Sequence, residues 1–318
     1  MKYSDVIVEQ VVRMTGAGAS SRQVAEKLGI GKSTVNDIWN RWIANPKPFY
    51  NPNAVAFNQT EGPKILVFDT ETSCPLVFAF GRRKQFINDK AIYKEGGRIL
   101  CFSYKWLGTD KVHSHWMTPQ EIEDNDDSRL ACILFGLYEE ADAVVGYNLQ
   151  GFDDKVVQTR ALACGLGKLP SVKKLDPYLQ AKKKLKLPSN SLDNVCAYFG
   201  LPQKTATGME LWAKVQSGDE QAMKDMVSYC ENDVLVLINV YNLLQGLGNV
   251  NTDYNAALYY NDNIVRCRTC GSTDVEVTGR IVTTSASVFE EVRCNECGSV
   301  HRIRTSDTTK EKRKSLLV

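Results

Sequence analysis

Apolar residues in the first 44 positions recur at helical spacing, which predicts a small helical region. A first helix, capped by Ser4, would end in the stretch TGAGAS at 15–20. A second helix would be capped by Ser21, and a third would begin at about Lys32 and bury Val35.

From residue 64 to residue 250, short apolar stretches alternate with helical patterns. The expected strands are 64–68, 99–106, 111–116 and 143–147, and the expected helices are 128–140, 152–165, 191–199 and 219–245. Strands that alternate with helices predict an α/β domain with a single core. Before it, residues 45–63 hold four prolines and four asparagines with little periodicity, which indicates a linker.

Two cysteine pairs stand near the C-terminus, in a β-rich region that we place at 262–305. Cys267, Cys270, Cys294 and Cys297 form a C-x2-C-x23-C-x2-C pattern, in which a glycine follows each pair. Four thiolates in tetrahedral geometry suit one structural Zn²⁺, whereas free thiols or a redox pair would be the alternatives.

Between the two cysteine pairs, Val275 to Thr284 alternates like a hairpin with Gly279 and Arg280 at its turn. Two knuckles and a hairpin resemble a zinc ribbon, and His301 could replace a cysteine as a ligand, although four cysteines already complete the shell. Contact with nucleic acid or with a protein is the usual use of such ribbons, and residues 306–318 would form a charged tail.

Composition limits the expected cellular location but does not indicate a binding partner. The 39 basic and 37 acidic residues leave a net charge of +2, so any nucleic-acid surface must come from local clustering. No apolar run reaches the length of about 18 residues that a membrane span needs, and the N-terminus lacks an apolar signal core. We therefore expect a cytoplasmic protein.

Acidic residues end the first predicted strand. Asp69 and Glu71 are two positions apart, so their side chains lie on the same face of the strand. Two close carboxylates repel each other unless a cation lies between them, and hard divalent ions such as Mg²⁺ prefer oxygen ligands. Acidic residues also end strands without any metal, so this pair alone does not decide the chemistry.

Two further acidic positions have both a structural and a functional interpretation. Asp153 opens a predicted helix, where the helix dipole alone favours a carboxylate, and Asp154 follows it directly. Tyr229 and Asp233 lie four residues apart on one helical face and could be a surface pair. The apolar residues 234–237 favour a buried Asp233, which would need a partner.

Together these residues resemble the DEDD superfamily of 3′–5′ exonucleases, the DnaQ-like branch of ribonuclease H-like folds. Its pattern reads D-x-E at 69–71, N-x-x-x-[FY]-D at 148–153 and Y-x-x-x-D at 229–233. The spacing selects Asp153 over Asp154, and Ser228 stands where the histidine subtype has its histidine, which favours the tyrosine subtype.

The resemblance covers about 64–245. Residues 96–108 and 191–201 look like stretches of bacterial and phage enzymes that are related to polymerase proofreading domains. If the protein is of phage origin, we expect it in the host cytoplasm. Too few residues follow 245 for a polymerase domain.

The resemblance implies a ribonuclease H-like mixed sheet flanked by helices and two-metal hydrolysis of single-stranded DNA. Asp69 would bridge two Mg²⁺ or Mn²⁺ ions, Glu71 and Asp233 would hold the ion that activates water, and Asp153 would hold the second ion through water. The Tyr229 hydroxyl would orient the water, because a phenol with a pKa of about 10 is a poor base near neutrality. An RNA-directed exonuclease and a DNA-binding regulator with an inactive nuclease fold are the alternatives.

Substrate contacts are predicted from local clusters. Either the basic group Arg82, Arg83 and Lys84 or the group Lys182, Lys183 and Lys184, near Lys173, Lys174 and Lys186, could follow a phosphate backbone or be a solvated face. Phe86, Tyr93 and Phe152 could stack on bases, although core packing is favoured for Phe152.

Residues 23–35 resemble the helix-turn-helix of sigma-factor and transposase families, with Gly29 at the turn. Lys32, Ser33, Thr34 and Asn36 would then face duplex DNA. Because residues 1–44 hold only six basic and four acidic residues, protein docking and a purely structural bundle are alternatives.

Overall fold

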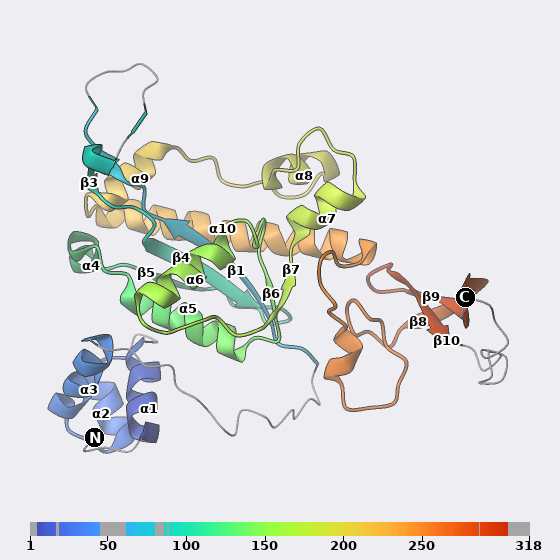
Figure 1. The fold of residues 1–318 in the computed structure, drawn as a ribbon, viewed down its shortest axis with the longest axis horizontal. Helices are drawn as coiled ribbons and strands as arrows, with labels where there is room; N and C mark the ends of the chain where they lie inside the picture. Colours follow the sequence, from blue (N-terminus) through green and yellow to red (C-terminus); the bar gives the residue numbers. More distant parts are fainter. Residues whose placement is uncertain are drawn as a thin grey trace.

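The computed structural model describes residues 5–16, 19–44, 62–79, 86–87, 89–285 and 287–304. Figure 1 shows helices at the N-terminal end, a central sheet covered by helices, and a small sheet near the C-terminus. Most of the expected linker, the expected tail and the expected cap Ser4 lie outside these described residues.

The N-terminal helices are α1 (Asp5–Gly16), α2 (Ser21–Leu28) and α3 (Lys32–Ala44), as expected. The expected cap Ser21 is wrong by one residue, because Ser20 caps α2. The Ser20 hydroxyl accepts a hydrogen bond from the Gln23 amide, and the Gln23 side chain accepts one from the Ser20 amide. Gly29 ends the helix in the left-handed conformation, with φ at 64°.

The central sheet has the strand order β5-β4-β1-β6-β7. Its strands are β1 (Ile65–Thr72), β4 (Ile99–Trp106), β5 (His113–Trp116), β6 (Ala143–Val145) and β7 (Lys173–Leu175). β1 pairs antiparallel with β4 and parallel with β6, so the predicted mixed sheet is confirmed. Strand β7 was not predicted, since it is short and begins with two lysines.

Helices cover both faces of this sheet (Figure 1). Leu66 and Phe68 of β1 pack in the same core as α5 (Ser128–Glu140) and α6 (Asp153–Ala163). Ile65 and Val67 point the other way, toward α10 (Glu220–Leu244). The alternating direction of β1 side chains therefore also places the odd-numbered residues that follow, including the predicted acidic pair, on the α10 side.

Several shorter elements complete this domain. They are β2 (Leu76–Val77), β3 (Ile92–Lys94), α4 (Pro119–Asp124), α7 (Pro177–Lys184), α8 (Leu192–Phe199), α9 (Met209–Gln216) and 3₁₀ turns at Asp89–Ala91, Gln245–Leu247 and Ala256–Tyr259. Of these, only α8 was predicted. No helix among the described residues is long and apolar enough to cross a membrane.

The N-terminal helices pack against the central domain. Val12 and Trp42 share an apolar cluster with Ala131 and Phe135 of α5. This contact buries apolar surface on both partners, so the N-terminal helices rest on the helical layer beneath the sheet.

The C-terminal sheet has the order β10-β9-β8, built from β8 (Val275–Thr284), β9 (Ser287–Cys294) and β10 (Val300–Arg304). The predicted hairpin turn at Gly279 and Arg280 is wrong, because β8 is one strand that pairs with β9 up to Thr284. The register shifts between Val277 and Ile281, where Gly279 has φ at 78°. The glycine signal thus marked a bulge, which needs the same backbone freedom as a turn.

Candidate active site and cysteine cluster

Three carboxylates meet where β1 passes α10. Asp69 and Glu71 lie on the α10 side of β1, and Asp233 faces them from the middle of that helix. One oxygen of each lies within 4.8 Å of one oxygen of each of the others. Glu71 is 9% exposed and Asp233 is 2% exposed, so water screens their repulsion poorly.

The charges of this group resist simultaneous ionisation. Burial raises the pKa of Asp69 well above its ordinary value, and the charges of Asp153 and Glu71 raise it further. Burial and the charge of Asp233 raise the pKa of Glu71 to about 8. Such carboxylates ionise together only when a cation neutralises them.

Asp153 begins α6 close to this group, as the sequence predicted, and it is buried. Its Oδ1 accepts a hydrogen bond of 2.6 Å from the Thr70 hydroxyl, and burial raises its pKa to about 6. It is not one of the three residues whose oxygens all lie within 4.8 Å of one another. Asp154 instead forms an ion pair with Lys174.

Tyr229 lies one helical turn before Asp233 on α10, and its ring packs edge-on against Trp212 at a centroid distance of 6.2 Å. Burial and the charge of Asp233 raise the pKa of its hydroxyl above the ordinary value. The phenol therefore stays protonated at neutral pH and can donate a hydrogen bond.

Lys204 completes the site and was missed by the sequence analysis. Its ammonium forms an ion pair with Asp233 and lies 3.4 Å from the Tyr229 hydroxyl. Burial alone would lower its pKa, but the hydrogen bond and the charge of Asp233 raise it above the ordinary value. A single lysine between α8 and α9, at no fixed distance from the acidic motifs, carried no signal in the sequence.

The donor set fits divalent cations. The oxygens are hard ligands, three carboxylates converge within ion-binding distance, and Asp233 Oδ1 is buried without a hydrogen-bond partner in the described structure. A buried acceptor that lacks a partner is unfavourable, and a hard cation would satisfy it. The acidic group could thus bind catalytic metal ions.

We predict that the metal-free protein loses stability as the pH rises from about 4.5 to about 8. Over this window folded Glu71 keeps a proton that the unfolded chain, with an ordinary pKa of 4.5, has released. The unfolded state therefore binds fewer protons, and unfolding becomes easier by on the order of 5 kcal/mol across the window. Urea denaturation at several pH values with EDTA measures this, and saturating Mg²⁺ should flatten the curve; a flat curve without Mg²⁺ would contradict the prediction.

We also predict that Lys204→Met lowers the free energy of unfolding of the metal-free protein by about 2–4 kcal/mol, because it leaves Asp233 buried without a cation. Mg²⁺ should restore most of the loss in the same denaturation experiment. Lys214→Met, which removes an exposed ion pair with Glu210, is the matched control and should leave stability almost unchanged, because solvent screens that pair. Equal effects of the two substitutions would refute the assignment.

The predicted cysteine ligands also come together. The Sγ atoms of Cys267 and Cys297 are 3.6 Å apart, those of Cys270 and Cys294 are 3.7 Å apart, and all four lie within 4.8 Å of one another. Tetrahedral Zn²⁺ with bonds of about 2.3 Å would place sulfurs about 3.8 Å apart. The spacing suggests a structural zinc site.

His301 lies beside this cluster. Its Nε2 is 2.8 Å from the Ser299 hydroxyl, which in turn is 3.1 Å from Cys267 Sγ. These polar contacts support the thiolates from outside, as residues around a metal site commonly do. Four sulfurs complete a tetrahedral shell without the histidine.

The predicted substrate contacts have mixed outcomes. Arg82, Arg83 and Lys84 lie outside the described residues, whereas Lys182, Lys183 and Lys184 are exposed on the last turn of α7. Phe86 and Tyr93 are exposed. Core packing of Phe152 is wrong, since its side chain is 46% exposed next to the start of α6. On α3, Lys32, Ser33 and Asn36 are exposed and Thr34 is half-buried.

Residues 89–245 match the family model described as RNase_H superfamily. No curated protein matches this chain. Among solved structures, the family B DNA polymerase from the hyperthermophilic archaeon Pyrobaculum calidifontis is similar, with 19% sequence identity and a TM-score of 0.43. The similarity covers 58% of this chain and 25% of that chain, so this chain spans about a quarter of the polymerase. The matched segment includes four strands of the mixed five-stranded sheet and the helices on both of its faces, and the chain therefore contains a ribonuclease H-like superfamily domain.

Proposed function

We propose that this chain is a metal-dependent 3′–5′ exonuclease that hydrolyses the phosphodiester bonds of single-stranded DNA. The observation that carries the proposal is the convergence of the Asp69, Glu71 and Asp233 carboxylates, together with the buried Asp233 Oδ1, which has no hydrogen-bond partner in the described structure. Asp233 lies within the segment that matches a superfamily of which nucleases are typical, and Asp69 and Glu71 lie on β1, which pairs with two strands of that segment. The order and spacing of the acidic motifs supply the direction of hydrolysis as an inference from resemblance.

Asp69, Glu71 and Asp233 would hold the divalent ions, and Asp153 would join them from α6. When bound, Mg²⁺ or Mn²⁺ supplies a positive charge for the phosphate and lowers the pKa of a water molecule. The hydrogen bond from Thr70 holds the Asp153 carboxylate at the edge of the site. Asp154 is held by Lys174 and takes no part in this scheme.

The remaining side chains would position the reactants. The Tyr229 hydroxyl is a donor because its pKa is raised, so it would orient the attacking water rather than deprotonate it. Lys204 carries a positive charge at the rim of the acidic group. Near a negatively charged phosphate this charge favours substrate entry.

The test is incubation of the protein with 5′-labelled single-stranded DNA and with RNA of matched sequence, with Mg²⁺ or Mn²⁺. We expect a ladder of DNA fragments that shorten from the 3′ end, and EDTA should abolish it. Faster shortening of RNA would replace the proposed substrate. Intact strands of both kinds, with a metal-loaded protein, would refute the nuclease.

We further propose that α2 and α3 act as a helix-turn-helix that brings the nuclease to duplex DNA. Gly29 supplies the left-handed turn between the helices, and exposed Lys32, Ser33 and Asn36 lie at the start of α3, where such motifs contact DNA. Fluorescence anisotropy with labelled duplex DNA tests this helix-turn-helix: Lys32→Glu should weaken binding, and unchanged binding would argue for protein docking instead.

We also propose that the cysteine cluster holds one Zn²⁺.

A further inference from the structure

A polar hollow opens beside the loop that leads to Asp153. It has a volume of about 500 Å³, and its lining includes Gln150, Lys173, Lys174 and Asn251. Gln150 lies three residues before Asp153, in the loop that enters α6. The hollow therefore lies beside the loop that enters α6 and along the edge strand β7.

A second hollow continues from the first toward the C-terminal sheet. It has a volume of about 330 Å³ and shares Thr252 with the first hollow. Its lining also includes Tyr254, Arg268 and His301, so it ends beside the cysteine cluster. We call the two hollows together the strand groove.

The C-terminal sheet is fixed close to the end of α10, which gives this groove a defined far wall. A Cβ atom added at Gly246 would lie 2.2 Å from the carbonyl oxygen of Cys297. Only glycine permits this approach of the two backbones. The groove thus runs between two parts of the chain that are in direct contact.

Positive charge exceeds negative charge along the strand groove. Lys173 and Lys174 form ion pairs with Asp253 and Asp154, which leaves the charge of that section balanced. Lys183 donates a hydrogen bond to the neutral Asn251 side chain, and the exposed Arg268 donates to the Tyr254 carbonyl oxygen.

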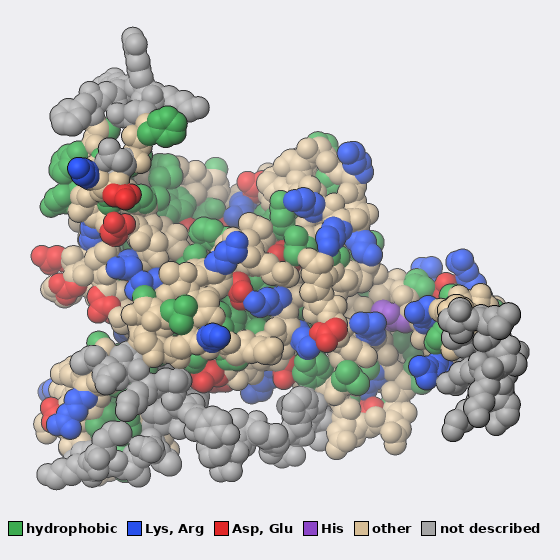
Figure 2. All heavy atoms as spheres, viewed as in Figure 1, with side chains coloured by type: hydrophobic (Ala, Val, Ile, Leu, Met, Phe, Trp, Pro, Cys, Tyr) green, Lys and Arg blue, Asp and Glu red, His purple; other side chains and the backbone are tan. Residues whose placement is uncertain are grey.

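The other exposed lysines of α7 add to this excess, and Figure 2 shows Lys and Arg side chains spread over this face, from the central domain to β8–β10. Polar walls with an excess of positive charge, open to solvent, are typical of surfaces that follow a phosphate backbone.

We propose that the strand groove binds the phosphate backbone of single-stranded nucleic acid on the 5′ side of the bond to be hydrolysed. The proposal rests on the proposed exonuclease function, since it places the 3′ end at the acidic group. Arg268 and Lys183 contact phosphates, and the C-terminal sheet holds the far end of the bound strand. A strand too short to reach Arg268 gains nothing from the groove.

The test measures binding apart from hydrolysis, by fluorescence anisotropy in an Asp69→Asn background with Mg²⁺. Labelled oligonucleotides of about 4 and about 16 nucleotides span the range of known single-strand site sizes. Arg268→Gln combined with Lys183→Gln should weaken binding of the longer strand about tenfold and leave the shorter strand within about twofold. The salt dependence for the longer strand should fall by about 1.4 in slope, since each lost phosphate contact contributes about 0.7.

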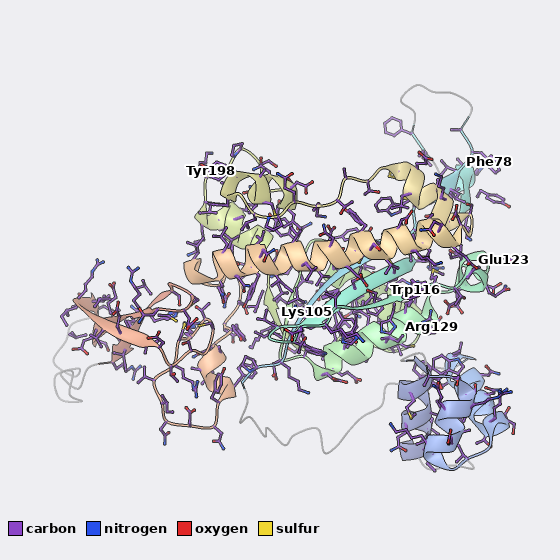
Figure 3. All side chains as sticks on the ribbon, turned by 180° about the vertical axis from the view of Figure 1, so that it is seen from behind. Phe78, Lys105, Trp116, Glu123, Arg129 and Tyr198 are labelled. Atoms are coloured by element: carbon purple, nitrogen blue, oxygen red, sulfur yellow. The ribbon has the colours of Figure 1, made fainter. Side chains whose placement is uncertain are left out.

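Lys105→Gln is the control for charge alone. Lys105 lies on β4, three strands away from β7 in the sheet order, and is labelled in Figure 3. Its replacement should leave both affinities unchanged, and the zinc content of every variant checks that the C-terminal sheet is intact.

Any of three results would refute the proposed role of the strand groove. These are equal weakening of binding for both oligonucleotides, an equal effect of Lys105→Gln, and unchanged binding by the double variant. If the wild-type protein shortened no strand but showed the predicted binding pattern, the nuclease function would be refuted and the strand groove would still be a binding site for single strands.

Discussion

Replacing Asp69 by asparagine should abolish hydrolysis and at the same time stabilise the metal-free protein. Burial raises the pKa of Asp69, and the charges of Asp153, Glu71 and Asp233 raise it further, so this carboxylate interacts with every other acidic residue of the site. Loss of its charge should remove ion binding and lower the rate at least about 10³-fold, because bound ions contribute several kcal/mol to such reactions.

The same substitution removes one source of buried repulsion. Without metal, we expect the free energy of unfolding to rise by roughly 0.5–2 kcal/mol, as is common where a functional site is relieved of strain. Single-turnover cleavage of labelled DNA and urea denaturation with EDTA measure the two effects. Asp110→Asn, at an exposed loop position, is the control and should change neither.

Opposite effects on activity and on stability are the signature of a site built for a cation. A variant that loses activity and also loses metal-free stability would show that Asp69 is mainly a structural acceptor. A variant that keeps activity would exclude Asp69 from ion binding.

Replacing Cys294 by serine should release the zinc ion and unfold the C-terminal sheet while the central domain stays folded. The buried apolar side chains of this region among the described residues are Cys267, Val292 and Cys294, so its apolar core is small. Binding of structural Zn²⁺ is worth about 10–16 kcal/mol in small zinc-dependent peptides, which makes the metal the main source of stability here.

Hydrogen exchange followed by mass spectrometry locates the loss. Residues 267–304 should exchange rapidly in the variant, and β1 and α10 should keep their protection. Metal analysis should find one zinc fewer per chain. Cys74→Ser, at a half-buried cysteine outside the cluster, should retain both the metal and the protection. Retained protection of β8–β10 after zinc loss would contradict the assignment.

The sequence by itself predicted the elements whose signal is local. Strand β4 and helix α5 begin and end at the expected residues, because each has an apolar periodicity longer than a few residues. The same local geometry predicted that Asp69 shares a face with Glu71 and that Tyr229 shares one with Asp233. The cysteine spacing likewise predicted four sulfurs that the structure brings together.

Short or charged helices and strands could not be predicted from apolar periodicity. Strand β7 and helix α7 are defined by their neighbours in the sheet and in the core, since neither has a clear periodicity of its own. At Gly279 the sequence indicated only that the backbone adopts angles that are unusual for other residues. Pairing of β8 with β9 on both sides of that residue decided that the angles belong to a bulge.

Only the tertiary structure decided which charges meet. Asp233 is 162 residues from Glu71 along the chain, and the packing of α10 on β1 brings their carboxylates together. The path of the chain between α8 and α9 places Lys204 on Asp233, and the position of α6 places Asp153 on the Thr70 hydroxyl. Periodicity fixes the direction of a side chain within its own helix or strand, whereas contacts between elements depend on how complete surfaces fit together.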